Sequence, residues 1–181
     1  MISIHHNGYQ IRLIDAGPED KLVFRNLIQL YQYDMSEFKG ADPDRHGLFD
    51  YSDLDHYWTR HGREAEGRQA ILIKIDEAVA GFAFLNNLAL SVPRDDTTRH
   101  LAEFFIMRRW RRRHLGKVIV KELFDTYPGV WEVREERENR NAQLFWRNVI
   151  QEYTGGGFKE QEFDEHAWKG PVQSFDNRGR L

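Results

Sequence analysis

Cysteine is absent from the 181-residue sequence. Its absence excludes disulfide bridges, cysteine zinc sites and thiol nucleophiles. The sequence also lacks an apolar run long enough to span a bilayer, and residues 1–6 lack the basic and apolar regions of a secretory signal. We therefore expect a cytoplasmic protein that does not associate with a membrane.

The sequence also has no large excess of positive or negative residues. Lys and Arg number 26 and Asp and Glu 29, which gives a formal net charge of −3. This balance provides no general attraction to nucleic acid, so any anion site has to come from local clustering of positive residues. A hydrophobic fraction of 40% is typical of a globular protein, and the length suits a single domain spanning residues 1–181.

The spacing of apolar residues predicts strands alternating with helices. Strands are expected at 9–14, 69–75, 78–85, 100–107, 130–133, 158–163 and 171–175, and helices at 18–35, 54–61, 115–127 and 139–153. This order predicts a mixed sheet with helices on its faces. The segment from strand 100–107 through helix 115–127 to strand 130–133 is a crossover of the kind that pairs its two strands in parallel.

Positive side chains gather between the strand at 100–107 and the helix at 115–127. They are Arg108, Arg109, Arg111, Arg112, Arg113 and Lys117. A helix begins with N–H groups that lack an internal partner and carry partial positive charge, so the backbone there can bind a phosphate. Gly116 leaves room for a close approach. This pattern favours a phosphate site, and a solvated basic loop or a nucleic-acid patch is the alternative.

The arginine-rich turn, Arg111-Arg112-Arg113-His114-Leu115-Gly116, resembles the coenzyme A pyrophosphate turn of the GNAT superfamily of N-acetyltransferases. That turn reads Gln or Arg, two residues, Gly, one residue, then Gly or Ala, and His114 replaces the first glycine here. The segment from Asn139 to Trp146 is similar to a later family helix that ends in Tyr, which is Trp146 here. The resemblance covers nearly the whole chain, and residues 33–38 and 152–156 resemble a bacterial branch of predicted acetyltransferases.

The resemblance implies a GNAT-like fold of class α/β, with a mixed, mostly antiparallel sheet of about six or seven strands flanked by about four helices. It implies an acetyl-CoA-dependent N-acetyltransferase that acts by direct transfer in a ternary complex. Acetyl-CoA is then the co-substrate, the acceptor is a small-molecule or peptide amine, and nucleic acid is not a partner. A homodimer is left open, because many relatives pair. The alternative, suggested by Trp146, is a non-catalytic CoA-binding or sensory module with the same fold.

The resemblance also assigns residues to acetyl-CoA. They are Phe104, Phe105 and Ile106 along the strand, Arg111, Arg112, Arg113, His114, Leu115, Gly116 and Lys117 at the turn, and Asn139, Phe145 and Trp146 on the later helix. Backbone groups of 104–106 would bond the pantetheine arm, and the two aromatic rings would line it. The alternatives are core packing for Phe145 and Trp146, and a helix N-cap for Asn139.

Glu103 is the candidate general base, acting through a water, because a carboxylate stands out in an otherwise apolar strand. The alternative is a glutamate that pairs with an arginine or faces water, and His100 could serve as the base in place of Glu103.

A pocket for a cationic amine could be formed by aromatic and acidic residues, namely Tyr31, Tyr33, Asp34, Glu37, Tyr57 and Trp58. The alternative is that these rings are core and the acids are solvated. The eight histidines lack the spacing of metal ligands, so no metal site is expected.

Overall fold

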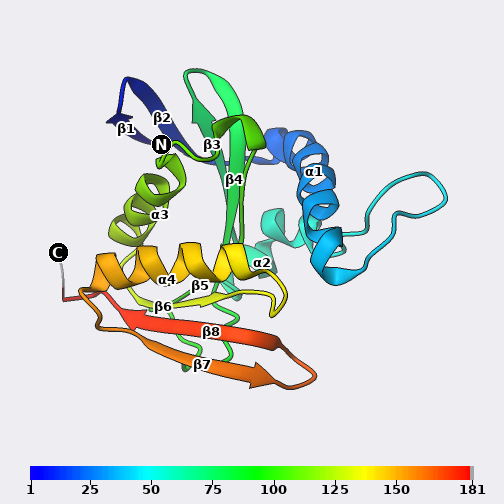
Figure 1. The fold of residues 1–181 in the computed structure, drawn as a ribbon. Coiled ribbons are helices and arrows are strands. Elements are labelled where there is room, and N and C mark those ends of the chain that lie inside the picture. The colour runs from blue at the N-terminus through cyan, green and yellow to red at the C-terminus, as the bar shows by residue number, and fades with distance from the viewer. Residues whose placement is uncertain (180–181) are drawn as a thin grey trace. The chain divides into compact units, whose positions relative to one another are not determined.

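The computed structural model describes residues 1–179 (Figure 1). The strands are β1 (Ile2–His6), β2 (Tyr9–Asp15), β3 (Gln69–Ile75), β4 (Ala78–Asn86), β5 (Thr98–Ile106), β6 (Val130–Arg134), β7 (Lys159–Asp164) and β8 (Lys169–Asp176). The α-helices are α1 (Lys21–Lys39), α2 (Arg60–Glu64), α3 (Leu115–Thr126) and α4 (Arg140–Thr154). Three short 3₁₀ helices are η1 (Pro18–Asp20), η2 (Leu54–Trp58) and η3 (Arg108–Trp110). None of the helices described is both long and apolar enough to cross a membrane.

The sheet has the strand order β1-β2-β3-β4-β5-β6-β8-β7. Neighbours β1 and β2, β2 and β3, β6 and β8, and β7 and β8 pair antiparallel. Strands β5 and β6 pair in parallel, with Leu101 opposite Val133. The predicted fold class, a mixed and mostly antiparallel sheet with four helices, is therefore confirmed, as is the parallel crossover through α3.

The sheet has one strand more than the six or seven expected, because β1 was missed. Strand β1 pairs with β2 through a two-residue turn in which Asn7 and Gly8 have φ values of 50° and 81°. A type I′ hairpin turn needs positive φ at both positions, which Asn-Gly supplies. The signal was therefore present in the sequence, together with the alternation of Ile2 and Ile4.

The helix expected at 54–61 is divided into η2 and α2. Thr59 between them is extended, with φ −81° and ψ 153°, and its hydroxyl accepts a hydrogen bond from the Gly62 N–H at 3.0 Å. Thr59 is thus the N-cap of α2, and a new helix begins where the periodicity predicted a continuous one.

The chain forms two compact units. Unit 1 comprises Met1–Phe84 and Glu103–Arg108, and unit 2 comprises Leu85–Ala102 and Arg109–Leu181. Strand β5 contributes residues to both units. The single domain over residues 1–181 stays a prediction.

The core of unit 1 is rich in aromatic rings. Helix α1 buries Phe24, Leu27, Ile28 and Tyr31, a spacing that places all four side chains on one helical face. Phe24 stacks on Phe84 of β4 at 5.5 Å between centroids. A network of such contacts fixes the position of α1 against β4, and so fixes which α1 side chains point inward.

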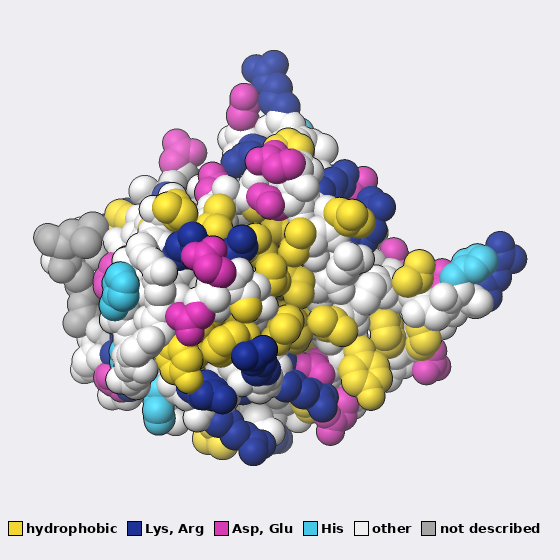
Figure 2. Space-filling model, turned by 90° about the horizontal axis from the view of Figure 1, so that it is seen from above, with side chains coloured by type: hydrophobic (Ala, Val, Ile, Leu, Met, Phe, Trp, Pro, Cys, Tyr) yellow, Lys and Arg dark blue, Asp and Glu magenta, His cyan; other side chains and the backbone are white. Residues whose placement is uncertain are grey.

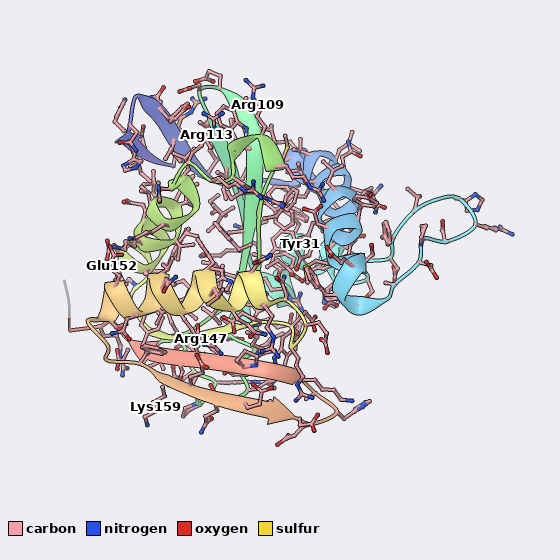
Figure 3. All side chains as sticks on the ribbon, viewed as in Figure 1. Tyr31, Arg109, Arg113, Arg147, Glu152 and Lys159 are labelled. Carbon is pink, nitrogen blue, oxygen red and sulfur yellow. The ribbon has the colours of Figure 1, made fainter. Side chains whose placement is uncertain are left out.

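Unit 2 has its own core beneath α3 and α4. Helix α3 buries Leu115, Ile119, Val120, Leu123 and Phe124, and α4 buries Gln143, Trp146, Val149 and Ile150. Two lysines of α3, Lys117 and Lys121, contact Glu152 near the end of α4, the second at 2.6 Å. These contacts join side chains of the first two turns of α3 to Glu152 in the last turn of α4, which is labelled in Figure 3.

Candidate functional site

The Glu103 carboxylate in β5 accepts hydrogen bonds from two tyrosines of unit 1. The Tyr31 hydroxyl of α1 donates to Oε2, and the Tyr51 hydroxyl, from the loop before η2, donates to Oε1 at 3.2 Å. Two phenol donors stabilise the ionised form of a carboxylate and fix its orientation. Glu103 itself is half-buried.

Tyr51 is a residue that the sequence did not suggest. Burial, followed by the negative charge of Glu103, raises the pKa of Tyr51 far above its usual range. Its hydroxyl therefore keeps its proton at any physiological pH and acts as a hydrogen-bond donor to Glu103. Tyr51 lies 52 residues from Glu103 in a segment without periodicity, so no sequence pattern pointed to it.

The predicted substrate residues of α1 divide between two faces of the helix. Tyr31 is buried and points toward β4, where its ring packs edge-on against Phe82 at 5.8 Å (Figure 3). Tyr33 is 64% exposed, and Glu37 is also exposed. Asp34 forms an ion pair with Arg108 at 2.7 Å. The structure thus brings Tyr31 to Glu103 and leaves Tyr33 and Glu37 on the outer surface.

Tyr57 and Trp58 of η2 contact other residues of unit 1. Tyr57 is 1% exposed and stacks on Phe84 at 4.0 Å. The indole N–H of Trp58 donates to the Ala16 carbonyl at 3.1 Å. Tyr57 thus lies in the core of unit 1, and Trp58 is half-buried beside it.

In unit 2, the arginine-rich turn has an unusual backbone. Arg112 and His114 both have φ of 60°, a left-handed conformation uncommon for residues other than glycine. The Arg113 side chain donates to the Arg109 carbonyl at 3.3 Å, and the Arg109 guanidinium lies 4.9 Å over the Trp110 ring (Figure 3). His114 thus adopts the conformation that the family glycine would allow, and the turn closes without that glycine.

Helix α3 begins directly at this turn. His114 is its N-cap and no side chain caps it, while Leu115 is fully buried and anchors the start. Arg111, Arg112, Arg113 and His114 are exposed. The first N–H groups of a 12-residue helix, ringed by exposed guanidinium groups, suit a phosphate in charge and in donor chemistry. The geometry fits a coenzyme A pyrophosphate, although Lys117 is engaged with Glu152.

At the start of α4, the Asn139 side chain accepts a hydrogen bond from the Ala142 N–H at 3.0 Å. Asn139 is therefore the N-cap, which was the alternative interpretation, and any contact of its side-chain NH₂ with a ligand stays a prediction. Trp146 is 7% exposed, and Phe145 is half-buried with its ring 5.0 Å from that of Trp146. Trp146 packs in the unit 2 core, whereas Phe145 keeps accessible surface.

The His100 side chain is buried among polar residues of unit 2. Its Nδ1 lies 3.0 Å from the Asn86 side-chain oxygen, and burial, then the nearby Arg134, lowers the pKa of His100 to about 3. Neighbouring Glu132 is fully buried and accepts from the backbone N–H groups of Leu90 and Ser91. His100 is thus a buried imidazole of low basicity, which does not suit the base role considered for it. Among residues 1–179, no group of three acidic or histidine side chains could hold a metal ion.

The chain is similar to a known family of proteins. A family model described as the acetyltransferase (GNAT) family matches residues 27–149, more than half of the chain. No curated protein matches the sequence.

Solved structures resemble the fold over most of its length. An acetyltransferase from Thermus thermophilus is 15% identical with a TM-score of 0.62, covering 92% of this chain and 96% of that one. The PaiA N-acetyltransferase of Thermoplasma acidophilum, in complex with coenzyme A, is 13% identical with a TM-score of 0.57, covering 92% and 98%. The spermidine N-acetyltransferase of Vibrio cholerae, with CoA and spermine, is 10% identical with a TM-score of 0.56, covering 91% and 92%. At this identity the likeness establishes the fold alone.

Proposed function

Because the chain belongs to the GNAT family of acetyltransferases, we propose that it transfers an acetyl group from acetyl-CoA to a primary amine, by direct attack within a ternary complex. The observation that carries this proposal is the Glu103 carboxylate, held in place by the hydroxyls of Tyr31 and Tyr51. A fixed, ionised carboxylate is the group that a protonated amine needs in order to bind and then lose its proton.

On the donor side, the arginine-rich turn would hold the pyrophosphate. The first N–H groups of α3 supply backbone donors, the exposed arginines supply charge, and Gly116 permits a close approach. Backbone groups of Phe104, Phe105 and Ile106 would bond the pantetheine arm, and Phe145 would line it with the accessible part of its ring. Trp146 would support Phe145 from the core.

In the proposed reaction, an ammonium group transfers one proton to Glu103 through a water, and the freed lone pair attacks the thioester carbonyl. The carbon–sulfur bond then breaks and the thiolate leaves. The nitrogen is still positively charged after the attack, and it loses its second proton to water as the neutral amide forms. Glu103 needs no further proton to complete the cycle, because it releases the one it took to solvent. Donors aimed at the carbonyl oxygen would stabilise the intermediate, and the backbone N–H groups of 104–106 are the candidates.

Neither Trp146 nor Tyr51 suits the role of general acid. An indole does not donate a proton usefully. The raised pKa of Tyr51 makes its phenol a weaker acid than an alkyl thiol, for which cysteine, with an ordinary pKa of about 8.5, is the reference. We propose that the thiolate takes its proton from water or leaves unprotonated.

The acceptor is proposed to be a cationic amine in the cytoplasm. The carboxylate of Glu103 and the rings around it, Tyr31, Tyr51 and Phe105, suit an ammonium group. Spermidine is the acceptor named for the Vibrio cholerae structure, and polyamines therefore belong in the first panel together with amino acids, peptides and aminoglycosides.

The test is release of free thiol from acetyl-CoA in the presence of each amine. We expect turnover with at least one amine, and a loss of about 10²-fold or more in kcat/KM for Glu103→Gln, the range that a general base contributes. Glu138→Gln, on an exposed residue of unit 2, is the matched control and is expected to keep full activity. Unchanged turnover in Glu103→Gln would contradict the assignment of the base.

A second candidate is a CoA-binding module without catalysis. It is favoured by Trp146, which occupies the position of the tyrosine that relatives use. It predicts binding of CoA, no thiol release with any amine, and no effect of Glu103→Gln on that binding.

A further inference from the structure

Two glutamines of α1 hold the end of the loop that connects α1 to η2. The Gln29 side chain donates to the Phe49 carbonyl at 3.0 Å and accepts from the Phe49 N–H at 2.8 Å. The Gln32 side chain donates to the Asp50 carbonyl at 3.2 Å. Gln29 thus uses both its donor and its acceptor on the backbone of one residue, Phe49.

The far part of the same loop is held by its own bonds. One Asp44 side-chain oxygen accepts from the N–H groups of His46 and Leu48 at 2.8 and 2.9 Å, and the Asp44 N–H donates to the Leu48 carbonyl. This part extends away from α1 (Figure 1), and its tip presents basic and histidine side chains (Figure 2). Hydrogen bonds within the tip therefore stabilise its conformation without contacts to the helix. The Gln29 bonds join the C-terminal end of the loop to α1.

Phe49 and Asp50 come directly before Tyr51 in the chain. The Tyr51 hydroxyl reaches Glu103 at 3.2 Å, and its ring lies 6.0 Å from that of Phe84. Because Tyr51 follows the anchored residues, the backbone position that Gln29 imposes also sets where the Tyr51 ring can reach. Gln29 is half-buried, which shields its two bonds from competing water.

We propose that Gln29 is a positioning residue that acts through Tyr51: it fixes the end of the loop so that the Tyr51 hydroxyl donates to Glu103 and keeps that carboxylate ionised and oriented. The kinetic consequence of this arrangement rests on the proposed function, in which Glu103 is the base. The arrangement itself does not, because it concerns the state of the carboxylate in the free protein.

A merely structural role for Gln29 would lower stability and leave the titration of Glu103 unchanged. Besides Glu103, the groups that raise the pKa of Tyr51 include Tyr57 of η2 and Tyr31 of α1. Tyr51→Phe and Gln29→Ala each replace a neutral side chain by another neutral one, so neither variant introduces a new charge. Removing a hydrogen bond from a charged acceptor makes that acceptor easier to protonate.

The experiment follows the side-chain carboxyl carbon signals of ¹³C-labelled glutamate by NMR across pH, with the Glu103 signal assigned through Glu103→Gln. The variants are Tyr51→Phe, Gln29→Ala, the double variant, and Asn26→Ala as a control on an exposed α1 amide. We expect the Glu103 midpoint to rise by about one pH unit, a tenfold change in proton affinity, in both single variants. The double variant should match Tyr51→Phe, and Asn26→Ala should match the wild type.

Three results would overturn the proposal. If Gln29→Ala leaves the midpoint of the Glu103 titration at its wild-type value, Gln29 does not influence Glu103. If Tyr51→Phe leaves that midpoint unchanged, the Tyr51 hydroxyl does not act on the carboxylate. Additive shifts in the double variant would mean that Gln29 does not act through Tyr51. Absence of thiol release with every amine would contradict only the proposed function, since the titration requires no turnover.

Discussion

The Glu135 carboxyl group follows β6 and is 97% buried in unit 2 (3% exposed), with neither oxygen in a hydrogen bond. Burial, and then the negative charge of Glu160, raises the pKa of Glu135 to about 9, while the nearby Arg147 acts in the opposite direction. Arg147 is already engaged with Glu160, which it contacts through two nitrogens at 2.8–3.0 Å (Figure 3). Glu135 is therefore a neutral acid in the folded protein near pH 7.

The sign of the pH effect follows from this raised pKa. Below the unfolded value of 4.5 the carboxyl is protonated in both states. Between 4.5 and about 9 only the native state holds the proton, so the free energy of unfolding falls by about 1.4 kcal/mol for each pH unit of increase. From pH 6 to pH 8 this amounts to about 3 kcal/mol, and the loss is complete once the pH passes about 9.

Glu135→Gln removes the titrating group and keeps a neutral side chain of similar size. Urea unfolding at pH 6, 7 and 8 gives the free energy of unfolding of both proteins. We expect the free energy of unfolding of wild type minus that of Glu135→Gln to decrease by about 3 kcal/mol from pH 6 to pH 8, since all other ionisable groups are the same in both proteins. Glu138→Gln, on an exposed residue, should run parallel to wild type. Parallel curves for wild type and Glu135→Gln would refute the buried neutral carboxyl.

Two further substitutions test the packing around the proposed site. A Cβ at Gly81 of β4 would lie 1.9 Å from the Phe105 carbonyl oxygen, so Gly81→Ala should lower the free energy of unfolding by about 3 kcal/mol in urea and weaken CoA binding by displacing residues 104–106; Gly157→Ala, with its nearest contact at 3.5 Å, is the control. Asn139→Ala removes the α4 cap and should lower stability by about 1 kcal/mol; a change below about 0.3 kcal/mol would count against the cap.

The sequence predicted the elements that show a clear period or turn. Strand β3 was predicted with the bounds that the structure has, and the helices after the arginine-rich turn were placed within a residue or two. The division of α1 was also predictable in principle. Phe24, Leu27, Ile28 and Tyr31 form one apolar face, and Tyr33, two residues on from Tyr31, is rotated about 200° from it.

Contacts between residues far apart in the chain could not be predicted from the sequence. The Tyr51 contact joins the loop to Glu103 of β5, 52 residues away in sequence, and the Gln29 contact joins α1 to Phe49 of the loop, 20 residues away. No local pattern encodes such contacts. No local pattern marks Glu135 as buried. Its neighbour across the structure is the backbone at Gly170, where an added Cβ would lie 2.3 Å from the Glu135 carbonyl oxygen. Asn139 shows the converse, since its cap role was available from the sequence alone.

Binding of coenzyme A at the arginine-rich turn is the most direct test of the account. Isothermal titration of CoA into wild type, Gly116→Glu and Gly157→Glu compares the same substitution at the turn and at an exposed glycine outside it. Binding by wild type and Gly157→Glu, together with a loss of at least about tenfold in Gly116→Glu at unchanged stability, is the predicted result, because a carboxylate there repels phosphate and blocks the first turn of α3. Equal affinity in all three proteins would show that coenzyme A does not bind at the arginine-rich turn.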